Sequence, residues 1–314
     1  MKKISFVIPC YKSSKTIGPV TEEIVKTVKE RAKEFDYEIL AVNDHSPDDT
    51  WKVLVELAEK DPKFKAINLA KNMNRPGAVM AGLGQATGDY VIMMDDDGQC
   101  PMDELWKLIA PLEEGHDVAM AKYTEYKQSA FKSFGTIFNR KMTEIIMDKP
   151  KDLDFTNFIA MKKYICDEII KYKNPYPYFT GLLLRTTSDL VNVKMEERSR
   201  LAGSTNFTFG KMVSLWMNGF TAFSVKPLRI ATILGFISAA IGFIYGLVII
   251  IMKIANPDSI SDGYSSIMAI ILLIGGIIML MLGLIGEYIG RIYISINNSP
   301  QYVIKEAKNL GKKN

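Results

Sequence analysis

Three consecutive aspartates, Asp95, Asp96 and Asp97, are the residues whose types and spacing most clearly indicate chemistry. They directly follow the apolar run 90–94, which is typical of a strand. Adjacent carboxylates repel one another, and Mg²⁺ or Mn²⁺ relieves this repulsion by taking oxygen ligands while it bridges to a diphosphate. Alternate side chains share one side of an extended chain, so Asp95 and Asp97 are the expected metal ligands. The alternative interpretation is a solvated acidic turn.

Two further polar loops follow predicted strands. Asp44 comes after the run 38–42, and its carboxylate can accept a hydrogen bond from a base or a ribose. The alternative for this loop is a simple helix cap formed by Ser46 and the helix start at Asp48. The run 4–8 ends in Pro9 and Tyr11, where a rigid turn and an aromatic ring can pack against a nucleobase. A nucleotide is therefore a candidate ligand of these loops.

A sheet is needed to bring these loops together. The first 195 residues alternate short β-branched runs with longer amphipathic patterns, which predicts an α/β fold of parallel βαβ units. Strands are expected at 4–8, 38–42, 64–69 and 90–94, and helices at 17–35, 48–59 and 76–87. In such open sheets ligands bind beyond the carboxyl ends of the strands. The sequence has no GxxxxGKS/T motif, and Gly82 and Gly84 lie inside a helical pattern, which disfavours P-loop and dinucleotide-binding proteins.

Two C-terminal runs, 230–252 and 264–286, each contain 23 residues without a charge. At about 1.5 Å per helical residue either run reaches roughly 35 Å, enough to cross a hydrocarbon layer of about 30 Å. Buried core helices are the alternative, but soluble helices of this length usually carry a polar stripe. Lysines and arginines flank the pair on its outer sides, whereas the intervening loop holds Lys253 against Asp258 and Asp262. This pattern predicts a multi-pass protein of the cell membrane with the N-terminal domain and both termini in the cytoplasm.

The formal net charge of +4 is unevenly distributed. Residues 201–314 hold nine Lys and Arg against four Asp and Glu, whereas residues 1–200 hold 30 against 31. Positive charge near the spans suits anionic lipid, and the balanced N-terminal part disfavours a nucleic-acid partner. Three distant cysteines are expected to be free thiols, and two histidines are too few for a zinc site. The segment 210–219 has a polar and an apolar helical face, which predicts a helix in the membrane interface or one packed on the domain.

The segments FVIPCY (6–11), NDHS (43–46), DDDGQCP (95–101) and GEYIGRIY (286–293), together with the two apolar runs, resemble glycosyltransferase family 2. The resemblance covers nearly the whole chain. It is strongest to the polyprenyl-phosphate glycosyltransferases related to dolichol-phosphate mannosyltransferase, in the bacterial form with two membrane helices. It implies a GT-A type, Rossmann-like nucleotide-sugar domain with a C-terminal transmembrane hairpin. The expected parts are the catalytic domain 1–204, juxtamembrane amphipathic helices 205–228, spans 229–253 and 264–288, the extracytoplasmic loop 254–263 between them, and a cytoplasmic basic tail 289–314.

The resemblance also implies roles for individual residues. The nucleotide is expected at Pro9, Tyr11, Asp44, Asp95 and Asp96, the metal at Asp95 and Asp97, and the reacting centre at Asp97 and Asp154, with Gln99 in the segment just after the aspartates. Arg198, Arg200 and Ser204 are expected near the acceptor phosphate, because a guanidinium stays charged and can bind two oxygens. For the arginines a surface salt bridge with Glu196 or Glu197 is the alternative.

The implied activity is metal-dependent, inverting transfer of a hexose from a nucleotide sugar to polyprenyl (undecaprenyl) phosphate, for modification of a cell-envelope glycan. UDP-hexose of the glucose type is the expected donor, because bacterial relatives commonly use it, and GDP-mannose is the alternative. Asn43, Cys100, Thr156 and Asn206 depart from the family pattern, so the resemblance does not fix the donor sugar. The acceptor phosphate has a second pKa of about 6, so much of it is already dianionic at neutral pH and hardly needs a base. Asp154 is therefore expected to act as a base or only to position the acceptor. A non-catalytic scaffold that binds nucleotide sugar and a polymerising synthase are the rival functions, and a homo-oligomer is possible.

Overall fold

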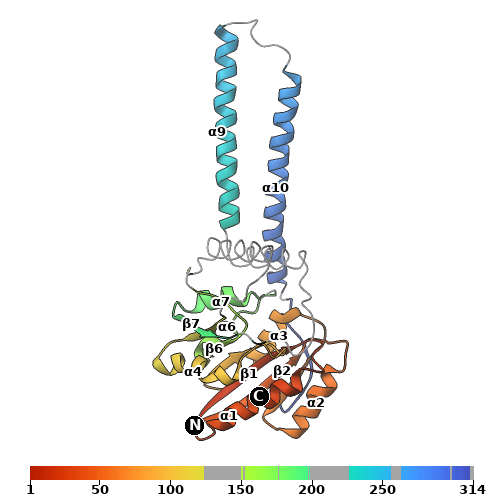
Figure 1. The fold of residues 1–314 in the computed structure, drawn as a ribbon. Helices are drawn as coiled ribbons and strands as arrows, with labels where there is room; N and C mark the ends of the chain where they lie inside the picture. Colours follow the sequence, from red (N-terminus) through yellow and green to blue (C-terminus); the bar gives the residue numbers. More distant parts are fainter. Residues whose placement is uncertain are drawn as a thin grey trace. The chain divides into compact units, whose positions relative to one another are not determined.

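The computed structural model describes residues 1–123, 150, 153–175, 177–196, 198, 226–255, 263–297 and 299–311. The chain forms two compact units (Figure 1). The first comprises Met1–Met212 with Asn298–Asn314 and carries the sheet, and the second comprises Val213–Asn297 and carries two long helices.

In the described part of the first unit, a sheet of eight strands has the order β7-β5-β6-β4-β1-β2-β3-β8. Its strands are β1 (Lys2–Cys10), β2 (Phe35–Asn43), β3 (Phe64–Leu69), β4 (Tyr90–Met93), β5 (Val118–Tyr123), β6 (Ile159–Lys162), β7 (Leu190–Met195) and β8 (Ile304–Lys308). Strand β1 pairs in parallel with β2 and β4, and β2 pairs in parallel with β3. The predicted parallel core is therefore confirmed. Strand β6 is antiparallel to β4 and β5, whereas β5 and β7 are parallel.

Helices cover both faces of this sheet. They are α1 (Ile17–Glu30), α2 (Thr50–Lys60), α3 (Asn74–Leu83), the 3₁₀ turn η1 (Met102–Glu104), α4 (Leu105–Glu114), α6 (Lys163–Ile169) and α7 (Phe179–Thr186). Helices α1, α2 and α4 bury apolar side chains in one core with Phe6 and Ile8 of β1. Helix α3 packs on the opposite face, where a Cβ added to Gly82 would lie 2.5 Å from Val7 Cγ1. Glycine at this position allows α3 to lie close to β1.

The three predicted helices form, with shifted ends. The helix expected at 17–35 ends at Glu30, because the run from Phe35 enters the core as β2. The helix expected at 48–59 begins at Thr50, whose N–H and hydroxyl both donate to Asp48 Oδ1. The helix expected at 76–87 is α3, which begins earlier and ends at Leu83.

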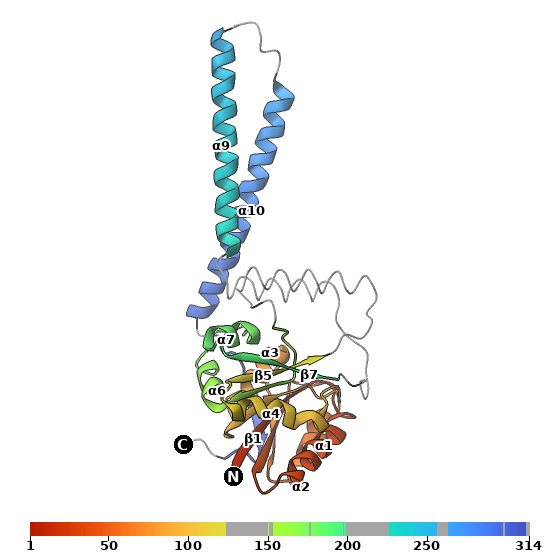
Figure 2. The same cartoon turned by 60° about the vertical axis from the view of Figure 1, so that its left-hand side comes forward.

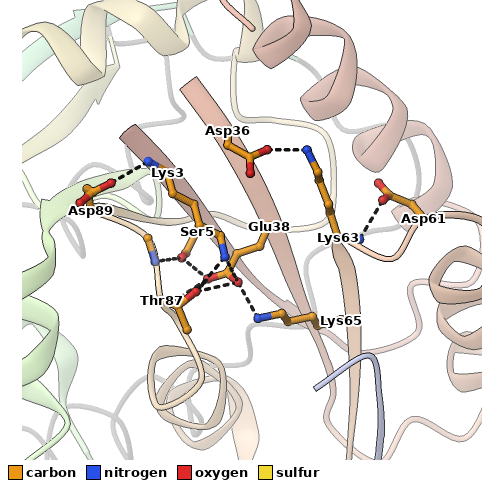
Figure 3. Close-up of polar contacts among 10 residues, drawn as sticks. Lys3, Ser5, Asp36, Glu38, Asp61, Lys63, Lys65, Thr87 and Asp89 are labelled. Atoms are coloured by element: carbon orange, nitrogen blue, oxygen red, sulfur yellow. Dashed lines mark hydrogen bonds and ion pairs between the residues drawn. The ribbon is translucent and has the colours of Figure 1, made fainter. Parts of the chain in front are cut away.

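A compensated polar cluster lies toward the amino ends of the parallel strands (Figure 3). Glu38 of β2 is only 1% exposed, and its carboxylate pairs with Lys3 and Lys65. The same carboxylate accepts hydrogen bonds from the Ser5 hydroxyl and from the Thr87 N–H. Every cation and donor needed by this buried charge is supplied by neighbouring strands and the loop before β4.

The segment after the second long helix returns to the first unit. Strand β8 pairs antiparallel with β3 at the edge of the sheet. Gln301 donates from Nε2 to the carbonyls of Tyr172 and Asn174, and Asn309 donates from Nδ2 to the Ala58 carbonyl at 2.6 Å. The sequence analysis expected only a basic tail in this segment, so the strand is an addition to that prediction.

The second unit contains α9 (Lys226–Ala255) and α10 (Tyr264–Ile296), which form a hairpin (Figure 2). Their segments Ala231–Val248 and Leu273–Ile296 are long and apolar enough to cross a membrane. Most of the large apolar side chains whose burial is described in these two helices are exposed, as expected for helices that face lipid. Both helices are longer than the predicted spans 229–253 and 264–288. The amphipathic helix predicted at 210–219 lies outside the described residues.

Candidate active site

The three aspartates stand at the carboxyl end of β4. The chain still pairs with β1 through the N–H of Met94, which donates to the Val7 carbonyl. Beyond this point Asp95, Asp96 and Asp97 are partly exposed, although the residues on either side of them are buried. Asp97 Oδ1 accepts a hydrogen bond from the Gln99 N–H at 3.1 Å, which shapes the turn. The predicted carboxylate cluster therefore lies at the edge of the sheet where ligands are expected.

Both carboxylate oxygens of Asp95 have partners. Arg75 of α3 places Nε and Nη2 each 2.8 Å from Oδ1. Asn157, in the segment before β6, donates from Nδ2 to Oδ2 at 2.6 Å. Asp95 therefore joins the start of α3 to the segment that carries Asp154. Neither Arg75 nor Asn157 was predicted as a site residue.

Asp96 has a different environment from Asp95. Burial, together with repulsion from Asp95 and Asp97, raises the pKa of Asp96 to about 6, against the opposing effect of the Ser13 hydroxyl. Asp96 also contributes to raising the pKa of the Cys10 thiol, after the larger effect of burial. Asp96 is thus influenced by the β1 loop, whereas Asp95 contacts α3. This difference agrees with side chains that alternate along the turn, and the metal roles of Asp95 and Asp97 stay predictions.

Asp44 is 3% exposed and lies at the end of β2. Its N–H donates to the Cys10 carbonyl at 3.0 Å, and its Oδ1 accepts from the Met73 N–H at 2.6 Å. Burial raises its pKa, although the Met73 N–H and His45 oppose this effect. Asp44 therefore fastens the start of α3 to the ends of β1 and β2, and its predicted contact with the nucleoside stays a prediction.

The β1 loop presents an exposed aromatic ring. Pro9 is still paired with β2, whereas Tyr11 is 47% exposed, and Lys12 Nζ lies 5.7 Å from the centre of the Tyr11 ring. The N–H of Lys12 donates to the Ser46 hydroxyl at 2.8 Å, which ties this loop to the loop after β2. The structure thus joins the two loops predicted to hold the nucleoside.

Unusual backbone angles mark the same edge of the sheet. Lys12 (φ +60°), His45 (φ +51°), Asn74 (φ +57°) and Gly98 (φ +78°) follow β1, β2, β3 and β4 respectively. A non-glycine residue in the left-handed region costs about 1–2 kcal/mol, and such residues cluster at functional sites. Among the described residues only Gly115 and Asn309 also have positive φ. The strained backbone is therefore concentrated where the aspartates lie.

Asp154 is held by residues of β5 and β7. Lys122 Nζ lies 2.8 Å from Asp154 Oδ2. The amide of Asn192 accepts from the Asp154 N–H at 2.7 Å and donates to the Asp154 carbonyl at 2.8 Å. The Thr156 hydroxyl donates to the Ala121 carbonyl at 2.8 Å. Lys122 and Asn192 were not predicted, because no short motif links them to Asp154.

Arg198 lies beside the acidic turn through its backbone. Its N–H donates to the Gln99 carbonyl at 3.3 Å, and Gln99 Nε2 donates to the Arg198 carbonyl at 3.4 Å. Its guanidinium pairs with Glu23 and Asp103, at 2.5 and 2.6 Å. These partners differ from the Glu196 or Glu197 pairing that the sequence suggested as an alternative. The phosphate role of Arg198 stays a prediction, and Arg200 and Ser204 lie outside the described residues.

The aspartate cluster fits a hard cation only in part. Carboxylate oxygens are the ligands that Mg²⁺ and Mn²⁺ prefer, and Asp95, Asp96 and Asp97 are consecutive in the chain. Within the described ranges, no group of three or more His, Cys, Asp or Glu side chains is arranged to hold a metal. A cation here would therefore take protein ligands from Asp95 and Asp97 and the rest from a diphosphate.

The chain matches the family described as Glycosyl transferase family 2 over residues 5–171, and the GtrB C-terminal hairpin over residues 226–292. It is 34% identical to the uncharacterized glycosyltransferase YkcC of Bacillus subtilis, covering 98% of this chain and 95% of that protein. It is 32% identical to a prophage bactoprenol glucosyl transferase homolog of Escherichia coli, covering 98% and 99%. Glucosyl-3-phosphoglycerate synthase from Mycobacterium tuberculosis, solved with Mn²⁺ and UDP, is similar in fold with a TM-score of 0.52 and 15% identity, covering 71% and 80%.

The fold and the matches together define the class of protein as a glycosyltransferase with a GT-A type domain. The chain belongs to glycosyltransferase family 2 and carries a C-terminal hairpin of the GtrB type. The resemblance drawn from the short motifs is thereby confirmed.

Proposed function

We propose that this enzyme transfers a hexose from a UDP-linked donor to a polyprenyl phosphate at the cytoplasmic face of the membrane. The observation that carries the proposal is the aspartate cluster at the carboxyl edge of a glycosyltransferase sheet, the same edge at which Tyr11 is exposed, in a chain that also bears an apolar hairpin. The Escherichia coli relative is named for glucose and for bactoprenol, which supports this choice of donor and acceptor.

The chain's path supports one side of the membrane for the catalytic domain and both termini. The chain leaves the sheet-bearing unit before α9 and re-enters it after α10, where β8 pairs with β3. If α9 and α10 each cross the bilayer once, the two crossings return the chain to its starting side. The lysines and arginines outside the spans favour the cytoplasm for that side.

The reaction is a single displacement at the anomeric carbon. An oxygen of the acceptor phosphate forms a bond to this carbon, and the bond from the carbon to the donor diphosphate breaks. UDP leaves, and the configuration at the anomeric carbon is inverted in the product. A divalent cation held by Asp95 and Asp97 would neutralise the charge that develops on the leaving diphosphate. In this scheme Tyr11, which is exposed, packs its ring on the base, and Asp154, which pairs with Lys122, orients the acceptor.

Purified protein in detergent tests the proposal directly. It is incubated with polyprenyl phosphate, with Mg²⁺ or Mn²⁺, and with one donor at a time from UDP-glucose, UDP-galactose, UDP-N-acetylglucosamine and GDP-mannose. The mass of the lipid product is measured by mass spectrometry. We expect one hexose per lipid, taken from a UDP donor. Transfer from GDP-mannose alone would support the alternative donor, donor binding without transfer would support a scaffold, and several sugars per lipid would support a polymerising synthase.

A further inference from the structure

Two ion pairs lie within the carboxylate-rich site. Both substrates of the proposed reaction carry phosphate, and Asp95, Asp96, Asp97 and Asp154 would repel them. Two of these carboxylates have a paired cation among the described residues: Asp95 pairs with Arg75, and Asp154 pairs with Lys122. The guanidinium of Arg198 is instead engaged by two carboxylates of α1 and η1. Arg75 and Lys122 are therefore the cations placed to offset the repulsion.

The geometry of Arg75 leaves part of its guanidinium for another acceptor. Nε and Nη2 converge on one oxygen of Asp95, whereas a guanidinium is shaped to bind two oxygens side by side. Asn157 takes the other carboxylate oxygen. Nη2 is buried and lies 2.8 Å from Asp95 Oδ1 as an ion pair, but this contact does not have the geometry of a hydrogen bond. A phosphate oxygen beside Asp95 would satisfy this donor.

Lys122 of β5 pairs with Asp154, which is three residues before the Asn157 that contacts Asp95. The side chains of Lys122 and Asp154 are each 39% exposed, so both are accessible to a ligand. Asn192 fixes the backbone of Asp154, and three residues later Asn157 contacts Asp95. The segment 154–157 therefore connects the Lys122 pair to the Arg75 pair. A displacement needs the incoming phosphate and the leaving diphosphate at different positions around the sugar, which matches two separate cations.

We propose that Arg75 binds the diphosphate of the donor and that Lys122 binds the phosphate of the lipid acceptor. The inference rests on the proposed function, because it takes polyprenyl phosphate as the acceptor. Each cation holds its aspartate in an ion pair and offers its remaining donors to one substrate. Because a hydrogen bond to a charged group is strong, loss of either cation weakens binding of one substrate about tenfold to a hundredfold.

The test compares Arg75→Gln with Lys122→Gln in purified protein. Michaelis constants are measured for the nucleotide sugar and for polyprenyl phosphate separately, and UDP affinity is measured by calorimetry with Mn²⁺ and without turnover. We expect Arg75→Gln to raise the donor KM and weaken UDP binding, and Lys122→Gln to raise the acceptor KM alone. Arg75→Lys and Lys122→Arg, which keep the charge, should recover part of each loss.

Matched controls come from ion pairs outside the site. Arg31→Gln removes the partner of Glu34, and Lys163→Gln removes the partner of Asp167, with the same chemical changes. Both should leave the two KM values within about twofold, since surface pairs contribute little. Equal effects of Arg75→Gln and Lys122→Gln on both substrates, or UDP affinity unchanged by Arg75→Gln, would overturn the inference. Wild-type protein that binds UDP but forms no lipid product would instead refute the proposed function.

Discussion

The pKa values of carboxylates are shifted in opposite directions at the two ends of the parallel strands. At the amino end, burial alone would raise the pKa of Glu38, but hydrogen bonds from Lys3, Lys65, Ser5 and Thr87 outweigh it and lower the pKa to about 2 (Figure 3). At the carboxyl end, burial and neighbouring carboxylates raise the pKa of Asp96 to about 6, and burial also raises the pKa of Asp44. Neither Asp44 nor Asp96 has an ion pair among the described residues.

The difference separates a structural cluster from a functional one. Glu38 has its charge compensated by strands on either side, so it contributes to folding. Asp44 and Asp96 have raised pKa values and no ion pair among the described residues, and the same edge of the sheet has several positive φ angles. Proteins retain such unfavourable features where a ligand needs them. Mutations at the two ends should therefore separate activity from stability.

The largest effect is expected from Asp97→Asn. Losing this carboxylate removes a proposed metal ligand, and we expect turnover at saturating donor to fall about 10²-fold to 10³-fold, the range found when one group that stabilises developing charge is removed. Asp154→Asn should lower turnover less, because a phosphate acceptor that is already largely ionised hardly needs a base. Initial rates of lipid product formation measure both. Turnover of Asp97→Asn equal to wild type would contradict the scheme.

Glu38→Gln should instead reduce stability and spare the chemistry. Removing one member of a buried charge network leaves Lys3 and Lys65 without their partner, at a cost of about 2–4 kcal/mol, toward the lower end of the usual range because Lys3 is 34% exposed. Thermal unfolding in detergent measures the loss, and donor KM at low temperature should stay at the wild-type value. Asp36→Asn, which breaks the exposed pair with Lys63, is the matched control and should cost under about 1 kcal/mol.

The same cluster predicts a pH dependence. Because the folded protein lowers the pKa of Glu38 from 4.5 to about 2, its stabilising contribution is complete above about pH 4.5 and is lost as the pH falls toward 2. The stability difference between wild type and Glu38→Gln should therefore shrink over this window. Unfolding followed at pH 7, 4.5 and 3 measures it. A difference that stayed constant from pH 7 to 3 would show that the carboxylate charge is not what stabilises the cluster.

Local sequence patterns were enough to predict the strands β1 to β4 and the loops that follow them. The aspartate cluster, Asp44 and Tyr11 could be found because each directly follows a buried apolar run, and the edge of a parallel sheet brings such positions together. Residue type and position relative to a strand carry this information without any tertiary contact.

Partners supplied by distant segments could not be predicted in the same way. Lys122 and Asn192 reach Asp154 only because β5 and β7 pair beside β6, and β8 joins β3 across more than 200 residues of sequence. Arg75 looks like an ordinary basic residue at the start of a helix until the fold places it against Asp95. Such contacts depend on strand order, which no short motif encodes.

The smallest expected effect is a gain in stability from Asp96→Asn. In the folded protein the pKa of this carboxyl is raised from 3.8 to about 6, so at pH 7 the ionised group destabilises the fold. An amide of the same shape removes that charge, and we expect stabilisation of about 1–2 kcal/mol, less than the full shift would give because the side chain is partly exposed. Thermal unfolding at pH 7 of Asp96→Asn and Glu38→Gln side by side measures both changes, an expected gain in stability for the first and a loss for the second. If Asp96→Asn also lowered the unfolding temperature, the carboxyl end would be compensated after all.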